Sequence, residues 1–214
     1  VEVLVFGDEL LDAGASSHGK VRDSLGPQLP GWLQRLGADC LSVTRVEDTL
    51  EAHVQAIAAA TADLIVTTGG TAAGPVDYLH SAIAQCNGSL LIDAVLVRPG
   101  YHQLFAQLPG RALVGLPGNP QSAVIGLLSL GSAFLYGRTG RALAPLPQVS
   151  LGRDVTAPTR EVRLALASLT DRVALPVEHS DSSMLRGFVA AEGFAVIPPG
   201  GALAGAAVQW LALP

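Results

Sequence analysis

The sequence predicts an α/β protein in which a parallel sheet carries helices on both faces, followed by a small, mostly β domain. Three observations lead to this prediction. From residue 1 to about residue 140, short apolar runs alternate with segments of helical apolar spacing. After residue 148, short β-rich segments separated by turn residues replace that alternation. Hydrophobic residues make up 49% of the 214 residues and charged residues only 14%, a composition that suits a sizeable core and excludes a disordered chain.

The first part of the chain is predicted to alternate strands and helices. Residues 1–6 form an apolar run that stops at Gly7, as a buried parallel strand does. Asp48 and Thr49 stand where the N-cap of the second helix is expected. The expected strands are residues 1–6, 40–46, 63–68, 90–97 and 112–116, and the expected helices are residues 29–36, 49–60, 76–85 and 119–136.

The pattern divides the chain into residues 1–140, a linker at 141–147 and a second domain at 148–214. The linker prediction rests on Pro145 and Pro147, which break regular structure. The expected β segments of the second domain are residues 149–156, 162–169, 173–177, 194–197 and 207–213, with one helical stretch at 183–191.

Charge and cysteine usage exclude several classes of protein. The formal net charge is −5 and no run of Lys or Arg occurs, so nucleic acid is not expected as a partner. Cys40 and Cys86 lie far apart and form no CxxC motif, which fits two ordinary thiols in a reducing compartment. The five histidines show no metal-binding spacing, so no zinc site is expected.

A membrane location is also not expected. The longest uncharged stretch, residues 112–136, is interrupted by Pro117 and Pro120. The remaining apolar piece is too short to cross a bilayer and is predicted to be a buried helix. The chain opens directly on Val-Glu-Val without a basic segment, so no signal peptide is expected and the predicted location is cytoplasmic.

Three unusual segments follow predicted strands, and their positions predict a ligand site. In open parallel sheets, ligands bind beyond the carboxyl ends of the strands. Gly-Asp-Glu-Leu follows the first strand at residues 7–10, a glycine-rich loop follows the third at 69–77, and Leu-Pro-Gly-Asn-Pro occupies 116–120. We expect these loops to converge at one edge of the sheet.

The glycine-rich loop is the clearest candidate for binding an anion. Gly69, Gly70 and Gly74 let the backbone approach a ligand closely, and free N–H groups at the start of a helix attract anions. The same residues are also compatible with a simple tight turn. Asp77 is predicted just inside the following helix, where its carboxylate either complements the helix dipole or binds a metal or ligand.

Charged and rigid residues complete the predicted edge. Arg98, after another strand, offers a cation to an anionic substrate. Asp8 or Glu9 offers oxygen ligands for Mg²⁺, unless both are simply solvated. Pro120 stands near the first position of a helix, where proline also serves as a plain structural cap.

Together these segments resemble the molybdopterin-binding family, and specifically its MoeA-type (gephyrin E-like) molybdopterin molybdotransferase branch. The resemblance covers nearly the whole chain and corresponds to the C-terminal two domains of that branch. It implies a three-layer αβα sheet, parallel with a mixed edge, and a small C-terminal β domain. The matching stretches are Gly-Asp-Glu-Leu at 7–10, Arg-Asp-Ser at 22–24, Asp48, Thr-Thr-Gly-Gly-Thr-Ala-Ala-Gly-Pro-Val-Asp at 67–77, Arg-Pro-Gly at 98–100 and Leu-Pro-Gly-Asn-Pro-Gln-Ser-Ala at 116–123.

The resemblance implies a reaction in which molybdate is inserted into adenylylated molybdopterin, with Mg²⁺, and AMP is released. It implies that Glu9, Asp48 and Asp77 surround the metal and molybdate, and that Arg98 takes the place of an anion-binding lysine. It further implies a homodimer. The implied pterin and phosphate cradle consists of Gly69, Gly70, Thr71, Gly74, Pro117, Gly118, Asn119, Pro120 and Ser122.

Three departures from the family pattern motivate an alternative function. Ala72 stands in place of a serine, Pro75 in place of an acid and Tyr101 in place of a second lysine. Each change removes a polar group that would hold substrate. The alternative is a molybdopterin-binding carrier, sensor or scaffold that inserts no metal.

Overall fold

The computed structural model describes residues 1–16, 18–72, 74, 77–178, 181 and 183–214. Pro75, one of the three departures named above, and His179, one of the five histidines, lie outside the described residues. Among the described residues, the helices are all too short or too polar to cross a membrane.

The first sheet has six strands in the order β4-β1-β5-β9-β8-β6. The first four are parallel to one another, whereas β8 runs antiparallel to both of its neighbours, β9 and the edge strand β6. The predicted parallel sheet with a mixed edge is therefore confirmed. The strands are β1 (Glu2–Phe6), β4 (Ser42–Val46), β5 (Leu64–Thr68), β6 (Ser89–Ile92), β8 (Leu104–Leu108) and β9 (Arg111–Leu116).

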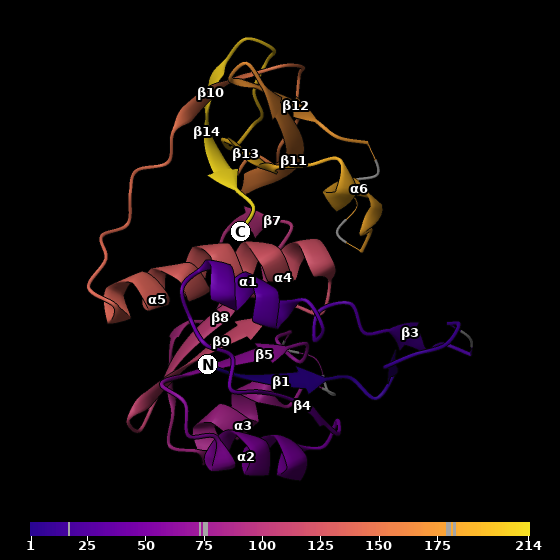
Figure 1. The fold of residues 1–214 in the computed structure, drawn as a ribbon, viewed down its shortest axis with the longest axis vertical. Coiled ribbons are helices and arrows are strands. Elements are labelled where there is room, and N and C mark those ends of the chain that lie inside the picture. The colour runs from indigo at the N-terminus through magenta and orange to yellow at the C-terminus, as the bar shows by residue number, and fades with distance from the viewer. Residues whose placement is uncertain (17, 73, 75–76, 179–180, 182) are drawn as a thin grey trace.

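Helices cover both faces of this sheet, as predicted (Figure 1). On one face lie α2 (Leu50–Ala59) and α3 (Leu79–Gln85). On the other face lie α1 (Leu29–Arg35) and a continuous helical stretch made of α4, a π-helical segment η1 and α5. These three pieces span Pro120–Gly126, Leu127–Gly131 and Ser132–Arg138.

Alternation along the buried strands sends successive side chains to opposite helical layers. In β1, Val3 and Val5 join the apolar cluster that contains α1 and α4. Leu4 and Phe6 join the cluster that contains α2 and α3. Because both faces are covered there, four successive residues of β1, from Val3 to Phe6, are all apolar and buried, which is the pattern expected of a buried parallel strand.

The second part of the chain forms a small closed β structure, which confirms the mostly β prediction. Its strands follow the order β12-β10-β14-β13-β11, and β12 also pairs with β11, which closes the ring. A single helical turn, α6 (Arg186–Val189), replaces the longer helix expected at 183–191. The strands are β10 (Gln148–Leu151), β11 (Val162–Thr170), β12 (Val173–Pro176), β13 (Gly193–Ile197) and β14 (Ala207–Ala212).

The prediction of one strand over residues 90–97 is wrong. β6 pairs with β8 at the edge of the first sheet, and the chain then leaves that sheet. The two residues of β7 (Val97–Arg98) pair in parallel with β11, a strand of the second sheet. Asp93 interrupts the apolar residues between β6 and β7, but hydrophobicity alone does not say in which sheet each apolar segment will pair.

Two further details differ from the sequence prediction. The sequence pattern does not predict β8, and its prediction that Asp77 lies within a helix is wrong. β8 and β9 form a hairpin in which Leu108 pairs with Arg111 across the Pro109-Gly110 turn, and that turn was the available signal. α3 begins at Leu79, so Asp77 lies before the helix. Val76, where the helix was expected to begin, lies outside the described residues.

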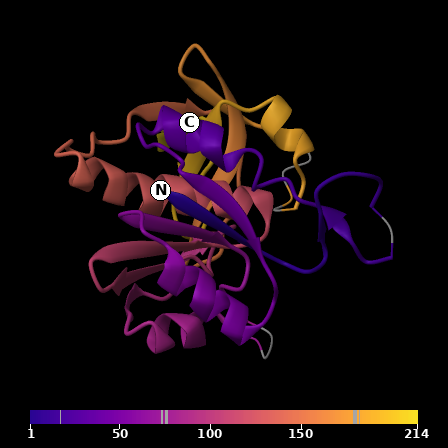
Figure 2. The same cartoon turned by 60° about the horizontal axis from the view of Figure 1, so that its bottom comes forward.

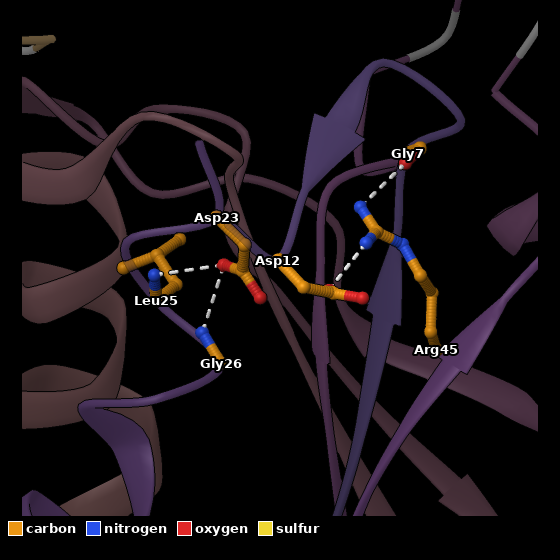
Figure 3. A network of polar contacts seen from close by, with 6 residues as sticks. All are labelled: Gly7, Asp12, Asp23, Leu25, Gly26 and Arg45. Atoms are coloured by element: carbon orange, nitrogen blue, oxygen red, sulfur yellow. Dashed lines mark hydrogen bonds and ion pairs between the residues drawn. The ribbon is translucent and has the colours of Figure 1, made fainter. Parts of the chain in front are cut away.

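An arm formed by residues 8–16 and 18–23 projects from the body of the molecule in both views (Figures 1 and 2). Its two short strands, β2 (Leu10–Leu11) and β3 (Val21–Arg22), pair with each other. Arg45 on β4 fixes the start of the arm, with Nη1 2.7 Å from an oxygen of Asp12 (Figure 3). The carboxylate of Asp23 fixes its end by accepting hydrogen bonds from the N–H groups of Leu25 and Gly26.

Candidate functional site

The loops at the carboxyl ends of the parallel strands meet, as predicted. The N–H of Gly69, after β5, donates to the carbonyl of Leu116, at the end of β9, over 2.9 Å. A Cβ on Gly118 would lie only 3.8 Å from the Cα of Gly69, so the two loops are in contact.

Glycine is required at the start of the loop after β5. Gly69 has φ of +83° and Gly70 has φ of +66°, both in the left-handed region that favours glycine. A Cβ on Gly69 would also lie 3.2 Å from the carbonyl oxygen of Phe6. The close approach and the backbone conformation explain why this segment is glycine-rich, and the tight-turn interpretation is therefore part of its role.

The acidic part of the edge is built around Asp8 and Asp48, which follow β1 and β4. The N–H of Asp8 donates to Oδ2 of Asp48 over 3.1 Å, and the N–H of Asp48 donates to Oδ1 of Asp8 over 3.3 Å. Glu9, next in the chain, is exposed to solvent. The reciprocal bonds hold two carboxylates of neighbouring loops close together beside Glu9.

A buried histidine lies beneath this pair. His53 is 1% exposed, and its Nε2 lies 3.5 Å from Oδ1 of Asp48. Its ring stacks on Phe6 with centroids 3.7 Å apart and meets Tyr78 edge-on at 5.9 Å. Burial lowers the pKa of His53, and the negative charge of Asp48 opposes that shift only in part. The ring is therefore neutral at physiological pH.

Asp77 closes the glycine-rich loop from the other side. Its Oδ2 accepts a hydrogen bond from the N–H of Gly74 over 3.0 Å. The next residue, Tyr78, packs edge-on against His53, whose ring lies beside Asp48. Thr71, in the middle of the loop, is buried.

The predicted metal ligands are oxygen donors of the kind that Mg²⁺ prefers. Among the residues described above, no three acidic, histidine or cysteine side chains gather around one point. Mg²⁺ is commonly held by one or two carboxylates, with substrate phosphates and water supplying the remaining ligands. The donor chemistry thus fits, and the assignment of Glu9, Asp48 and Asp77 as the metal site stays a prediction.

A cavity of about 420 Å³ lies where the α/β part meets the β part. Its lining includes four of the predicted site residues, Arg98, Pro117, Asn119 and Ser122. Gly118 and Pro120 lie next to this lining in the chain without being part of it. The predicted residues that lie outside the lining are Glu9, Asp48, Gly69, Gly70, Thr71, Gly74 and Asp77.

Arg98 is held in place at one wall of the cavity. Its Nε donates to Oε2 of Glu161 over 2.8 Å, and its guanidinium lies 5.7 Å from the ring centre of Tyr101. The hydrogen bond to Glu161 raises the pKa of Arg98 above its ordinary value, so the side chain keeps its positive charge.

Sequence reasoning missed the contribution of the β part to this cavity. Arg163 on β11 is the register partner of Arg98 on β7, and both residues line the cavity. Asp181 lines it as well. The sequence carries no signal for this, because a two-residue strand within an apolar run does not reveal which distant strand it will pair with.

Comparison with known proteins agrees with this architecture. Residues 2–136 match the family described as "Probable molybdopterin binding domain". The chain therefore belongs to the molybdopterin-binding domain family. Residues 148–213 match a second description, "MoeA C-terminal region (domain IV)", so the small β part is similar to the C-terminal region of MoeA proteins.

Named relatives share about a third of the aligned residues. A molybdopterin molybdenumtransferase of Staphylococcus aureus (strain COL) is 32% identical over 186 residues, covering 83% of this chain and 44% of the relative. One from Staphylococcus epidermidis is 32% identical over 129 residues, covering 59% of this chain and 31% of the relative. The chain thus spans less than half the length of these relatives.

A solved structure confirms the fold over nearly the whole chain. The crystal structure of a molybdopterin biosynthesis MoeA protein from Pyrococcus horikoshii superimposes with a TM-score of 0.82. The superposition covers 99% of this chain and 53% of that chain, at 22% sequence identity.

Proposed function

We propose that this chain carries the molybdate-inserting half of a molybdopterin molybdotransferase, which acts on adenylylated molybdopterin and releases AMP. The observation that carries the proposal is the cavity between the two parts of the chain. It gathers Arg98, Arg163, Asn119 and Ser122, two cations and two neutral hydrogen-bonding groups, around a space large enough for a small anionic ligand.

The residues at this cavity have distinct proposed roles. Arg98 and Arg163 bind anionic oxygens, since a guanidinium presents several N–H donors to phosphate or molybdate. Asn119 and Ser122 orient the ligand by hydrogen bonds. The glycine-rich loop at Gly69, next to the cavity, is proposed to offer backbone N–H groups to the ligand, since Gly69 and Gly70 adopt a left-handed turn that other residues disfavour.

The proposal includes Mg²⁺ at the acidic edge, held by Asp48 with Glu9 and Asp77. When bound, the ion would neutralise phosphate charge and favour departure of AMP. The hydrogen bond from Gly74 to Asp77 and the bonds between Asp8 and Asp48 orient these carboxylates. The neutral ring of His53 also lies against Asp48, with Nε2 3.5 Å from Oδ1.

A homodimer and a cytoplasmic location belong to the same proposal. The homodimer follows from the resemblance to the molybdotransferase branch, and the location from the two cysteines without a CxxC motif, which fit a reducing compartment. The acidic net charge agrees with a small-molecule substrate and no nucleic-acid partner.

The test is AMP release from adenylylated molybdopterin by the purified chain with Mg²⁺, with and without molybdate. Molybdate-dependent AMP release supports the proposal. Ligand binding without AMP release, in the chain alone and after addition of the remaining part of a relative, favours the carrier alternative. Absence of both binding and release overturns the assignment for this chain.

Replacing Asp77 with Ala tests the acidic edge. Asp77→Ala is expected to lower molybdate-dependent AMP release on the order of 100-fold or more, because a proposed carboxylate ligand of the Mg²⁺ is lost. Asp63→Ala is the matched control. Asp63 immediately precedes β5, at the end of the strand away from the glycine-rich loop, and pairs with Arg138 at the surface. Equal turnover in both variants contradicts the role of Asp77.

A further inference from the structure

Gln103 is a fully buried polar residue that the proposed reaction does not use. It is 0% exposed and stands just before β8. Its Nε2 donates to the carbonyl oxygen of Gly100 over 3.0 Å. Its Oε1 lies 2.6 Å from the hydroxyl of Ser129, whose single hydrogen is shared between this oxygen and the carbonyl oxygen of Ile125 at 2.7 Å. Both ends of the side-chain amide are thus hydrogen-bonded inside the protein, which is the condition for burying such a group at low cost.

The partner of its acceptor end lies in an irregular part of the long helical stretch. Ser129 belongs to η1, where the N–H of Ser132 donates to the carbonyl of Leu127, five residues back. Such π-helical insertions are rare and often occur at functional sites. Gly126, just before η1, packs directly against Gln103, since a Cβ there would lie 3.5 Å from the Cβ and from Oε1 of Gln103, and 2.9 Å from Cδ2 of Leu116.

The partner of its donor end belongs to the cavity wall. Gly100 follows Arg98 and precedes Tyr101, and all three residues line the cavity. A Cβ on Gly100 would lie 3.5 Å from the carbonyl oxygen of Ser122 and 3.4 Å from a methyl group of Ile125. The loop carrying Arg98 therefore lies directly on α4, whose first turn carries the opposite wall.

We propose that Gln103 is a positioning residue for the cavity. By bridging Gly100 and Ser129, it holds the loop of Arg98 and Tyr101 at a fixed place against α4, and so sets the spacing between Arg98 on one wall and Ser122 on the other. Its effect on substrate rests on the proposed function. Its effect on the loop does not.

Hydrogen exchange of the loop is the first test. Gln103→Met keeps the volume of the side chain and removes both hydrogen bonds, and it is expected to speed amide exchange in residues 97–104 about tenfold. The control is Ile83→Val, in the cluster on the far face of the sheet, compared at a temperature equally distant from its own unfolding midpoint. Equal acceleration of residues 97–104 in both variants, or none in Gln103→Met, overturns the proposal.

A pair of substitutions at the other end separates the hydrogen bond from general packing. Ser129→Ala removes the hydroxyl that bonds Gln103, whereas Ser129→Thr retains it. Ser129→Ala is expected to speed exchange of residues 97–104, and Ser129→Thr is expected to show the wild-type rate. The reverse order contradicts the bridge.

Ligand affinity distinguishes this proposal from the proposed function. We expect Gln103→Met to bind adenylylated molybdopterin about tenfold more weakly than Ile83→Val, because the walls no longer match the ligand. If wild type binds and Gln103→Met binds equally well, the positioning role fails while the function stands. If wild type itself binds neither this compound nor AMP, the function fails, and the exchange experiment still decides the role of Gln103.

Discussion

At the scale of single residues, the environment of His53 shows how burial controls charge beside the acidic edge. Neither ring nitrogen has a hydrogen-bond partner of good geometry among the described residues, although Nε2 lies 3.5 Å from Asp48. The ring packs as an aromatic group between Phe6 and Tyr78. A protonated imidazole there would lose much of its hydration, which is why its pKa falls.

This lowered pKa predicts a pH dependence of stability. Because the folded pKa lies below the unfolded value of 6.5, the unfolded state takes up the proton first as pH falls. Stability from His53 is therefore fully present above about pH 7 and is lost as pH falls through the unfolded value toward the folded one. The free energy of urea unfolding should decline as pH falls from about 7 through the unfolded value of 6.5.

His53→Phe keeps the aromatic contacts and removes the titration, so its decline over the same range should be smaller. Protonation of Glu2 and of Asp63 also lowers the stability of the protein in acid, because both carboxylates have lowered pKa values. The cause is a hydrogen bond from the N–H of Thr61 for Glu2 and one from Arg138 for Asp63. Their unfolded values of 4.5 and 3.8 place that loss at lower pH. Parallel curves for wild type and His53→Phe would contradict the assignment.

At the scale of elements, α2 begins where local chemistry dictates. Thr49 is its N-cap, and its Oγ1 accepts a hydrogen bond from the N–H of Ala52 over 3.2 Å. The cap also fixes where Asp48 stands, since the two residues are neighbours at the end of the β4 loop. A cap residue therefore links the start of a helix to the acidic edge.

Thr49→Ala is expected to cost about 1 kcal/mol of unfolding free energy, because one N–H at the helix start loses its acceptor. Thr49→Ser keeps that acceptor and should cost much less. Chemical unfolding of the two variants, with wild type as reference, measures the difference. A loss of equal size in both would show that the Thr methyl group, and not the cap, stabilises this turn.

At the scale of the whole molecule, the two parts of the chain share one core. The apolar cluster around α1 and α4 includes Leu164, Leu166 and Phe194 of the β part. The pairing of β7 with β11 adds backbone hydrogen bonds across the same junction. These contacts hold the cavity walls in register.

A shared core predicts one cooperative unfolding transition. Trp32 lies in α1 and Trp210 in β14, so each reports on one part of the chain. Single-tryptophan variants Trp32→Phe and Trp210→Phe should give unfolding midpoints that differ only by the stability cost of each substitution, as checked by circular dichroism on the same samples. Two separate transitions in one variant would show that the parts unfold independently.

The sequence by itself determined the elements whose signals are local. The apolar run of β1 and its stop at Gly7, the cap at Thr49 and the glycines after β5 each depend on neighbouring residues, so their positions could be predicted. Even the convergence of the loops followed from a general rule, because parallel strands end at one edge.

Tertiary structure alone decided which distant residues meet. Asp93 separates the apolar residues of β6 and β7, but nothing local says that the two strands enter different sheets. Arg163 became a cavity residue only through the pairing of β7 with β11. The hydrogen bonds of Gln103 likewise depend on how η1 packs against the preceding loop. Which distant residues come into contact depends on the burial and hydrogen bonding of the whole folded chain. A local sequence pattern describes only one of the two segments that form such a contact.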